Sequence, residues 1–244
     1  MTARDTLTAI AAPTGDIGAH FYFHPATVAA LKEIGLSAFP AYVLGRGGAL
    51  GDVPAAVVSA AFGYFNPDTL GPTWTKYRER VSPPVAAEAY WHECGRRGAE
   101  LFADIDGLDA YVEAADVVIE HAPVAALPLF AGTSQLECSD DVPARSMQKA
   151  AVLRELRGSA HLVAVVASGL SDSQAHAIKR PDDVAIFGWE TPPELPENAD
   201  DLMAAAEDLT NTILEPAFAA LSTEQSDALV TATHAMHAAL TPDA

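Results

Sequence analysis

The chain has 244 residues, with 14 Lys and Arg against 33 Asp and Glu, so its formal net charge is −19 and its pI about 4.5. This charge opposes binding to DNA phosphates and to anionic membranes, so we expect neither DNA nor a membrane to be a partner. Half of the residues are hydrophobic, which is enough for a substantial core. Two cysteines do not make a disulfide framework and favour a reduced, cytoplasmic protein.

The first 122 residues predict a series of helices. Residues 1–15 are small and polar, and we expect part of this segment to be disordered. The glycine-rich stretch 37–52 should turn the chain between helices. The helix that follows it is nearly all apolar and should therefore be central and buried. The pattern predicts helices at about 25–35, 52–65, 66–80, 85–102 and 106–122.

A proline- and glycine-containing loop, 123–143, is predicted to separate two halves of the chain. The predicted organisation is an N-terminal helical unit at 1–122, this connecting loop, and a C-terminal helical unit at 144–244. The last unit should end in two long helices, 199–214 and 222–240. Because such amphipathic helices often bury against a copy, a homodimer is a possible assembly.

The stretch 149–178 predicts a helix, a tight turn and a second helix. Gly169 supplies the left-handed residue that ends the first helix, and Ser171 with Gln174 forms a capping box for the second. Apolar residues at intervals of three and four predict the buried seam of the first helix: Leu153, Leu156, Ala160, Val163 and Ala167.

The same helix–turn–helix pattern occurs earlier in the chain. When Gly35 is aligned with Gly169, the sequence Gly-Leu-Ser coincides at both places. One interpretation is a pair of helix-turn-helix units in tandem, and the other is chance similarity between alanine-rich helices. The sequence alone leaves both open.

Three segments carry a resemblance to a known family. LRELRGSAHLVAVVASGL, YVLGRGGALGDVPAAVVSAAFGYFNPDTL and AEDLTNTILEPAFAALSTEQSDALV resemble, in order, patterns of the SalK-like proteins of high-GC bacteria. The resemblance implies a mostly α, winged-helix-derived fold of two helix-turn-helix-like units, and some members are encoded in polyketide gene clusters. Members usually carry a wing-like β-hairpin where this chain has the proline-rich segment 180–198, so the wing is expected to be missing.

Cationic side chains provide the first candidate site. Arg46 lies among glycines that could free backbone amides to bind an anion, although a surface arginine in a tight connection is an equal alternative. Arg154, Arg157 and His161 follow helical spacing beside an apolar seam, where arginines bind carboxylates or phosphates and a histidine can act as acid or base. Ion pairs with Glu155, Glu207 or Asp208 are the alternative, which would make them structural.

Aromatic residues provide the second candidate. Tyr22, Phe62 and Trp189 could line an apolar ligand cavity, with core packing as the other interpretation. His20 and His24 are spaced like metal ligands, but no third ligand is evident, so no metal site is predicted. The sequence contains no recognisable cofactor-binding motif, so it does not indicate which cofactor, if any, the protein binds.

These observations predict a small-molecule-binding helical protein, and possibly a cofactor-less enzyme of secondary metabolism with His161 as its catalytic residue. The small-molecule ligand would be anionic or amphiphilic and would be bound by Arg46, Arg154 and Arg157. Whether the chain is an enzyme is left open. The alternative is a helix-turn-helix transcription regulator, which the net charge of −19 and the missing wing disfavour.

Overall fold

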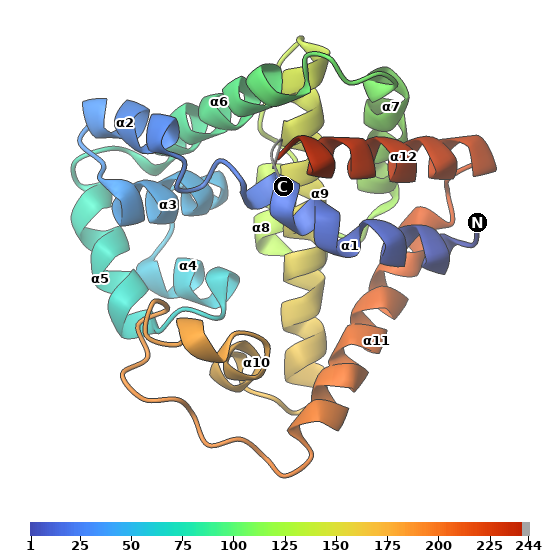
Figure 1. The fold of residues 1–244 in the computed structure, drawn as a ribbon. Coiled ribbons are helices and arrows are strands. Elements are labelled where there is room, and N and C mark those ends of the chain that lie inside the picture. Colours follow the sequence, from blue (N-terminus) through green and yellow to red (C-terminus); the bar gives the residue numbers. More distant parts are fainter. Residues whose placement is uncertain (241–244) are drawn as a thin grey trace.

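Residues 1–240, the part of the chain that the computed structural model describes, form twelve α-helices and two short 3-10 helices, and no strand occurs in that part (Figure 1). The mostly α fold class predicted from the sequence is therefore confirmed. The helices are α1 (Ala3–Ala19), α2 (Pro25–Glu33), α3 (Ala38–Gly47), η1 (Gly48–Leu50), α4 (Ala55–Phe62), α5 (Pro67–Arg78), α6 (Pro83–Phe102), α7 (Leu108–His121), α8 (Pro128–Thr133), α9 (Val142–Ala167), α10 (Asp172–Lys179), η2 (Pro181–Asp183), α11 (Ala199–Phe218) and α12 (Thr223–Ala239).

The long helix α9 runs through the middle of the molecule, and α1, α6, α7 and α11 pack around it (Figure 1). It begins at Val142, inside the predicted loop, because Asp141 accepts a hydrogen bond from the amide of Ala144 and Pro143 suits a first helical turn. Its predicted seam is wrong at the far end, where Val163 and Ala167 are exposed. At that end Ala164 and Val165 are buried instead, in a small cluster with Ala175 of α10 and Ala206 of α11.

The N-terminal segment is a helix, so its predicted disorder is wrong. Thr2 and Asp5 form a reciprocal capping box that satisfies the first free amides of α1. Leu7, Ile10 and Ile17 are buried on the face that contacts α9 and α12. These residues are three and seven positions apart, which is a helical spacing. The small residues between them make this pattern hard to recognise in the sequence.

Residues 38–47 form a helix, not the predicted glycine-rich turn. A Cβ added at Gly45 would overlap the ring of Tyr90, and one at Gly48 would overlap the carbonyl oxygen of Pro83. These glycines therefore allow α3 and η1 to approach α6 closely, and they do not serve to turn the chain. Arg46 consequently projects from the last turn of a helix, where most backbone amides are already hydrogen-bonded.

Two further expectations differ from the structure. The apolar helix α4 buries only one face, and Val57 on its other face is 43% exposed. Helix α11 continues through Pro216 to Phe218, beyond its predicted end at residue 214.

Two tight turns of the same form occur in the two halves of the chain. Gly35 and Gly169 both have left-handed backbone conformations, with φ of 90° and 85°. Each is followed by a buried leucine, Leu36 or Leu170, and then by a serine at the N-cap of the next helix. The Gly-Leu-Ser coincidence in the sequence thus corresponds to matching turns between α2 and α3 and between α9 and α10.

The main hydrophobic core extends from Leu7 in α1 to Met236 in α12, so both predicted units contribute to it. The predicted connecting loop 123–143 contains the short helix α8. The division at this loop remains a prediction, as does the homodimer. Within the chain, α11 and α12 already bury apolar residues against α9, α1 and α7. In residues 1–240 no single helix has both the length and the apolar character to cross a membrane.

Candidate functional site

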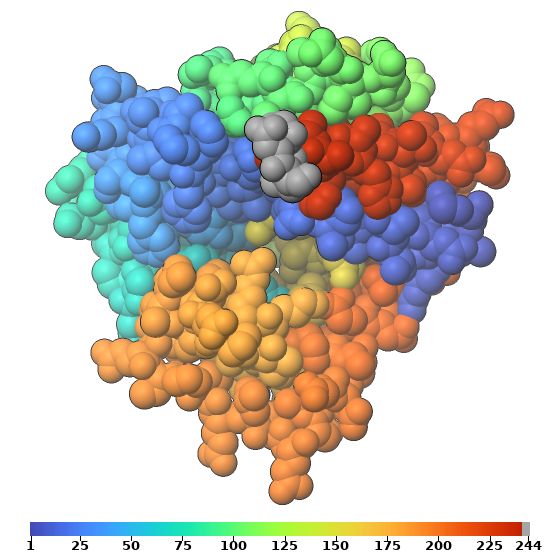
Figure 2. Space-filling view, in the orientation of Figure 1, coloured from blue at the N-terminus to red at the C-terminus, as the bar shows by residue number. Residues whose placement is uncertain are grey.

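A cavity of about 810 Å³ lies between α1, α3, α4, α9, α10 and α11. Figure 2 shows the surface hollowed between α1 and the segment that contains α10, with α9 at the floor. The volume is within the range of small-molecule pockets, about 300–1,000 Å³.

The structure brings six of the seven predicted site residues to the wall of this cavity, which are Tyr22, Arg46, Phe62, Arg154, Arg157 and His161. Trp189 is not among the lining residues. Its indole Nε1 donates a hydrogen bond of 2.9 Å to the carbonyl oxygen of Tyr64, which fixes segment 180–198 against the end of α4. Whether the six residues bind a ligand remains a prediction.

Arg46 is held by a buried carboxylate. Its Nε and Nη2 each donate a hydrogen bond of 2.8 Å to one oxygen of Glu155, and its Nη1 donates to the hydroxyl of Tyr42 at 3.0 Å. Its guanidinium also lies 4.5 Å from the ring centre of Phe62. With all three nitrogens engaged, Arg46 shapes the cavity wall more than it offers donors to a ligand. The alternative given above for Arg46, a surface arginine, does not hold, because its side chain is only 13% exposed and forms this bidentate ion pair.

Glu155 remains charged in the core because cations surround it. Burial alone would raise the pKa of Glu155, but the charges of Arg46 and Arg154 and the hydrogen bonds from Arg46 and Tyr22 lower this pKa to about 2. The Tyr22 hydroxyl donates to the carboxylate at 2.8 Å. Two cations, Arg46 and Arg154, thus surround the single carboxylate of Glu155.

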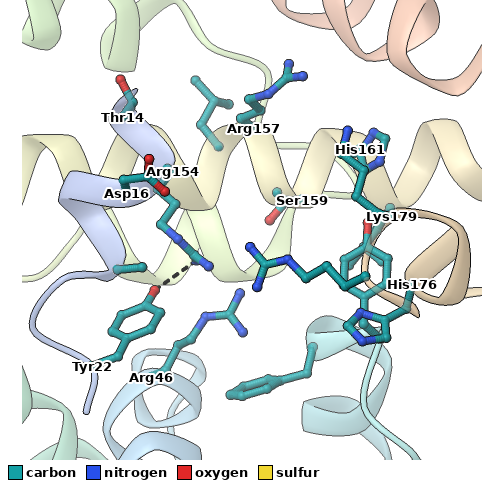
Figure 3. A pocket seen from close by; sticks show the side chains of 18 of the residues that line it. Thr14, Asp16, Tyr22, Arg46, Arg154, Arg157, Ser159, His161, His176 and Lys179 are labelled. Atoms are coloured by element: carbon teal, nitrogen blue, oxygen red, sulfur yellow. Dashed lines mark hydrogen bonds between the residues drawn. The ribbon is translucent and has the colours of Figure 1, made fainter. Parts of the chain in front are cut away.

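Arg154 lies beside Arg46 and Glu155, and Figure 3 shows its hydrogen bond to Tyr22. Its Nη1 donates to the hydroxyl of Tyr22 at 2.9 Å and to Glu155 at 3.3 Å, and its guanidinium lies 4.8 Å from the Tyr22 ring centre. Both hydrogen bonds start from Nη1. Among residues 1–240, therefore, Nε and Nη2 of Arg154 have no hydrogen-bond partner.

A second ionic cluster lies farther along α9. Arg157 donates from Nη2 to Glu207 at 2.6 Å and from Nη1 to Asn211 at 3.2 Å, and Lys179 of α10 pairs with the other oxygen of Glu207. Glu207 thereby connects α9, α10 and α11. The predicted alternative of an Arg157–Glu207 ion pair is realised, although the cavity is still beside it.

His161 is hydrogen-bonded within the wall. Its Nδ1 lies 2.9 Å from the hydroxyl of Thr210, and its Nε2 is 4.0 Å from Glu207. Burial lowers the pKa of His161 below its usual value, although Glu207 opposes this shift. The imidazole is therefore neutral at pH 7, and a catalytic role for it remains a prediction.

The cavity wall also contains His176 and Lys179 of α10, which were not among the predicted site residues. His176 is 5% exposed, and its ring is tilted against that of Phe187 with the ring centres 3.9 Å apart. Its Nε2 has no hydrogen-bond partner among residues 1–240. The signal that could have found it is its position on the inner face of a capped helix, next to buried Ala175.

The described residues contain no cluster of three or more His, Cys, Asp or Glu side chains that could hold a metal ion. His20 and His24 stack with their ring centres 6.1 Å apart. Their side chains therefore pack ring against ring.

Comparison with known proteins assigns the family. Residues 8–187 match a family described as a helix-turn-helix family, and this range includes both Gly-Leu-Ser turns. No curated protein and no solved structure matches the chain. The match favours the alternative function, a helix-turn-helix transcription regulator. The main prediction, that the function of the chain is to bind a small molecule or to act as a cofactor-less enzyme of secondary metabolism, is therefore wrong. Since the match covers well over half of its length, the chain belongs to this helix-turn-helix family.

Proposed function

We propose that the protein is a DNA-binding transcription regulator and that α10 is the helix it presents to DNA. The observation that carries the proposal is the turn at Gly169 between α9 and α10, inside the matched region. In helix-turn-helix regulators the helix after such a turn enters the major groove with its N-terminal residues toward the bases. Here that helix begins at Asp172, directly after its N-cap residue Ser171.

The first turn serves a different purpose. Helix α3, which follows Gly35, is buried along most of its length and therefore has no free face for a groove. Helix α10 has one buried face, and Ser171, Lys179 and Arg180 at its two ends are exposed. We therefore assign DNA contact to the second turn and a structural role to the first.

The acidic charge determines what kind of binding is possible. With 14 cations against 33 anions, the chain has few side chains to neutralise phosphates, which is why DNA was not expected as a partner. A regulator of this composition must take its affinity from a few base contacts, and its non-specific affinity must be low. Binding then depends strongly on sequence and only weakly on salt.

Finer points of the assignment are also proposals. We place the chain among the SalK-like proteins of high-GC bacteria, on the three sequence segments quoted above, and in the cytoplasm. We also propose that segment 180–198 takes the place of the wing. Beyond η2 this segment has no regular secondary structure, and the side-chain amide of Asn66, at the start of α5, donates a hydrogen bond to the carbonyl oxygen of Gly188 within it.

The test is selection of bound duplexes from a random library at about 50 mM salt, followed by affinity measurement on the enriched sequence. The expected result is one enriched motif whose binding is lost in a Gln174→Ala, Lys179→Gln variant. A matched control is Lys32→Gln, at an exposed position on α2. Failure to enrich any motif, with no binding to mixed duplexes at the same salt, would overturn the proposal.

A further inference from the structure

The wall of the cavity is rich in cations although the chain is strongly acidic. Five of its 14 Lys and Arg residues line the cavity, against three of its 33 Asp and Glu residues. The Glu155 carboxylate behind Arg46 adds one more negative charge nearby. Cations are thus concentrated around this space in a molecule that otherwise has few of them, which favours an anionic occupant.

Among these cations, Arg154 has the donors that an anion needs. The nitrogens of Arg46 are engaged by Glu155 and Tyr42, and Arg157 uses both terminal nitrogens for Glu207 and Asn211. Arg154 retains Nε and Nη2, which form one edge of a planar fork suited to a carboxylate. Asp16, the acidic residue on the same side in Figure 3, is 65% exposed in its side chain and bonds to His237.

The rest of the wall suits an apolar body. Phe39, Phe62 and Phe65 form one side with tilted and edge-to-face rings, and Phe187 stacks on Phe65 at 4.2 Å. Two buried polar atoms in the wall, Oγ1 of Thr14 and Nε2 of His176, have no partner among residues 1–240. Buried polar atoms are normally hydrogen-bonded, so these two atoms mark positions for polar groups of an occupant.

We propose that the cavity binds an anionic amphiphile, with its carboxylate on Nε and Nη2 of Arg154 and its apolar body against the phenylalanines, and that this ligand is an effector of the regulator. The effector role rests on the proposed function, whereas the binding site does not. Coupling follows from the position of α10, because His176 and Lys179 line the cavity while Ser171, at the other end of the helix, is exposed on the outer surface. A ligand in the cavity therefore contacts the helix that faces DNA, and no reaction on the ligand is implied.

Binding is measured by calorimetry with two matched pairs of probes, decanoate against decan-1-ol and 2-naphthoate against 2-naphthol. The expected result is that at least one acid binds more tightly than its alcohol. Arg154→Gln should weaken that acid roughly ten- to a hundredfold, the effect of losing a charge-assisted hydrogen bond, and should leave the alcohol unchanged. Absence of binding by both acids, or equal binding by wild type and Arg154→Gln, overturns the site.

Two further variants make the assignment specific. Arg157→Gln removes a cation whose terminal nitrogens are already used, so it should weaken the acid less than threefold. If Arg157→Gln weakens the acid as much as Arg154→Gln does, the cavity attracts the acid through its net charge and the assignment to Arg154 is wrong. Arg154→Lys keeps the charge and loses the planar fork, so it should give an intermediate affinity and serves if Arg154→Gln does not fold.

The regulatory half is tested separately with the selected duplex. A saturating acid should change the affinity of wild type for DNA at least threefold, and it should have no effect on Arg154→Gln. Acid binding without any DNA binding supports the site and overturns the proposed function. DNA binding that the bound acid does not alter overturns the effector role and leaves the regulator.

Discussion

Arg46 and Glu155 are 109 residues apart in the chain, and two hydrogen bonds of 2.8 Å join the guanidinium of one to the carboxylate of the other. The pair links the end of α3 to the centre of α9, and the Glu155 side chain is only 3% exposed. A buried carboxylate is tolerated only with such partners, because removal from water costs several kcal/mol per ion. The pair therefore holds the first half of the chain to the central helix.

Arg46→Ala should lower the free energy of unfolding by about 3–5 kcal/mol, the usual cost of leaving a buried charge without its main partner. Urea unfolding followed by circular dichroism measures this. Arg180→Ala is the control, because Arg180 and its partner Asp183 are 62% and 40% exposed in their side chains, and this change should cost less than about 1 kcal/mol. Equal losses in the two variants would show that the Arg46 pair is not structural.

The same carboxylate gives the protein a defined sensitivity to acid. The pKa of Glu155 is lowered from 4.5 to about 2 in the folded state. Its contribution to stability is therefore complete above the unfolded pKa of 4.5 and is lost as the pH falls toward 2, by on the order of 3 kcal/mol in total. Glu155→Gln should be less stable at pH 7 but should lose less stability between pH 4.5 and 2. A variant with the same acid slope as wild type would contradict this.

Local signals predicted many of the elements, and contacts distant in sequence explain most of the misses. The capping box at Ser171 and the turn at Gly169 are complete within a few residues, and the structure has both. The role of Gly45 depends on Tyr90 in α6, which no local pattern reveals. It was therefore interpreted as a turn residue, although its missing Cβ serves helix packing.

The candidate site shows the same division. Helical spacing placed Arg154, Arg157 and His161 on one wall, because three- and four-residue intervals fix a direction. Which arginine keeps free donors depends on Tyr22 and Glu207, which come from other helices. The sequence could therefore predict the cationic wall, whereas the distinction between Arg154 and Arg157 required coordinates.

Two glycine substitutions should have opposite effects on stability. Gly48→Ala places a methyl group against the carbonyl oxygen of Pro83 and should destabilise by at least about 1–3 kcal/mol, because backbone cannot move aside easily. Gly158→Ala, inside α9, meets nothing within 4 Å and should stabilise by up to about 1 kcal/mol through helix propensity. Thermal unfolding of both variants is the measurement. A stabilising Gly48→Ala would disprove the close approach of η1 to α6.

The proposed DNA contact predicts an unusually weak dependence on salt. Only Lys179 and Arg180 are exposed cations at the end of α10, and Lys179 also pairs with Glu207. Two phosphate contacts give a slope of log affinity against log salt of about −1.8 per chain, since each contact contributes about −0.9. Replacing both residues by Gln should bring the slope close to zero while the preferred sequence stays the same, because phosphate contacts position the protein and base contacts specify the sequence.

Fluorescence anisotropy from about 50 to 200 mM salt measures the slope, and Lys32→Gln on α2 should leave the slope unchanged. A wild-type slope several times steeper would mean that another cationic surface meets the DNA, and α10 would then no longer be the assigned element.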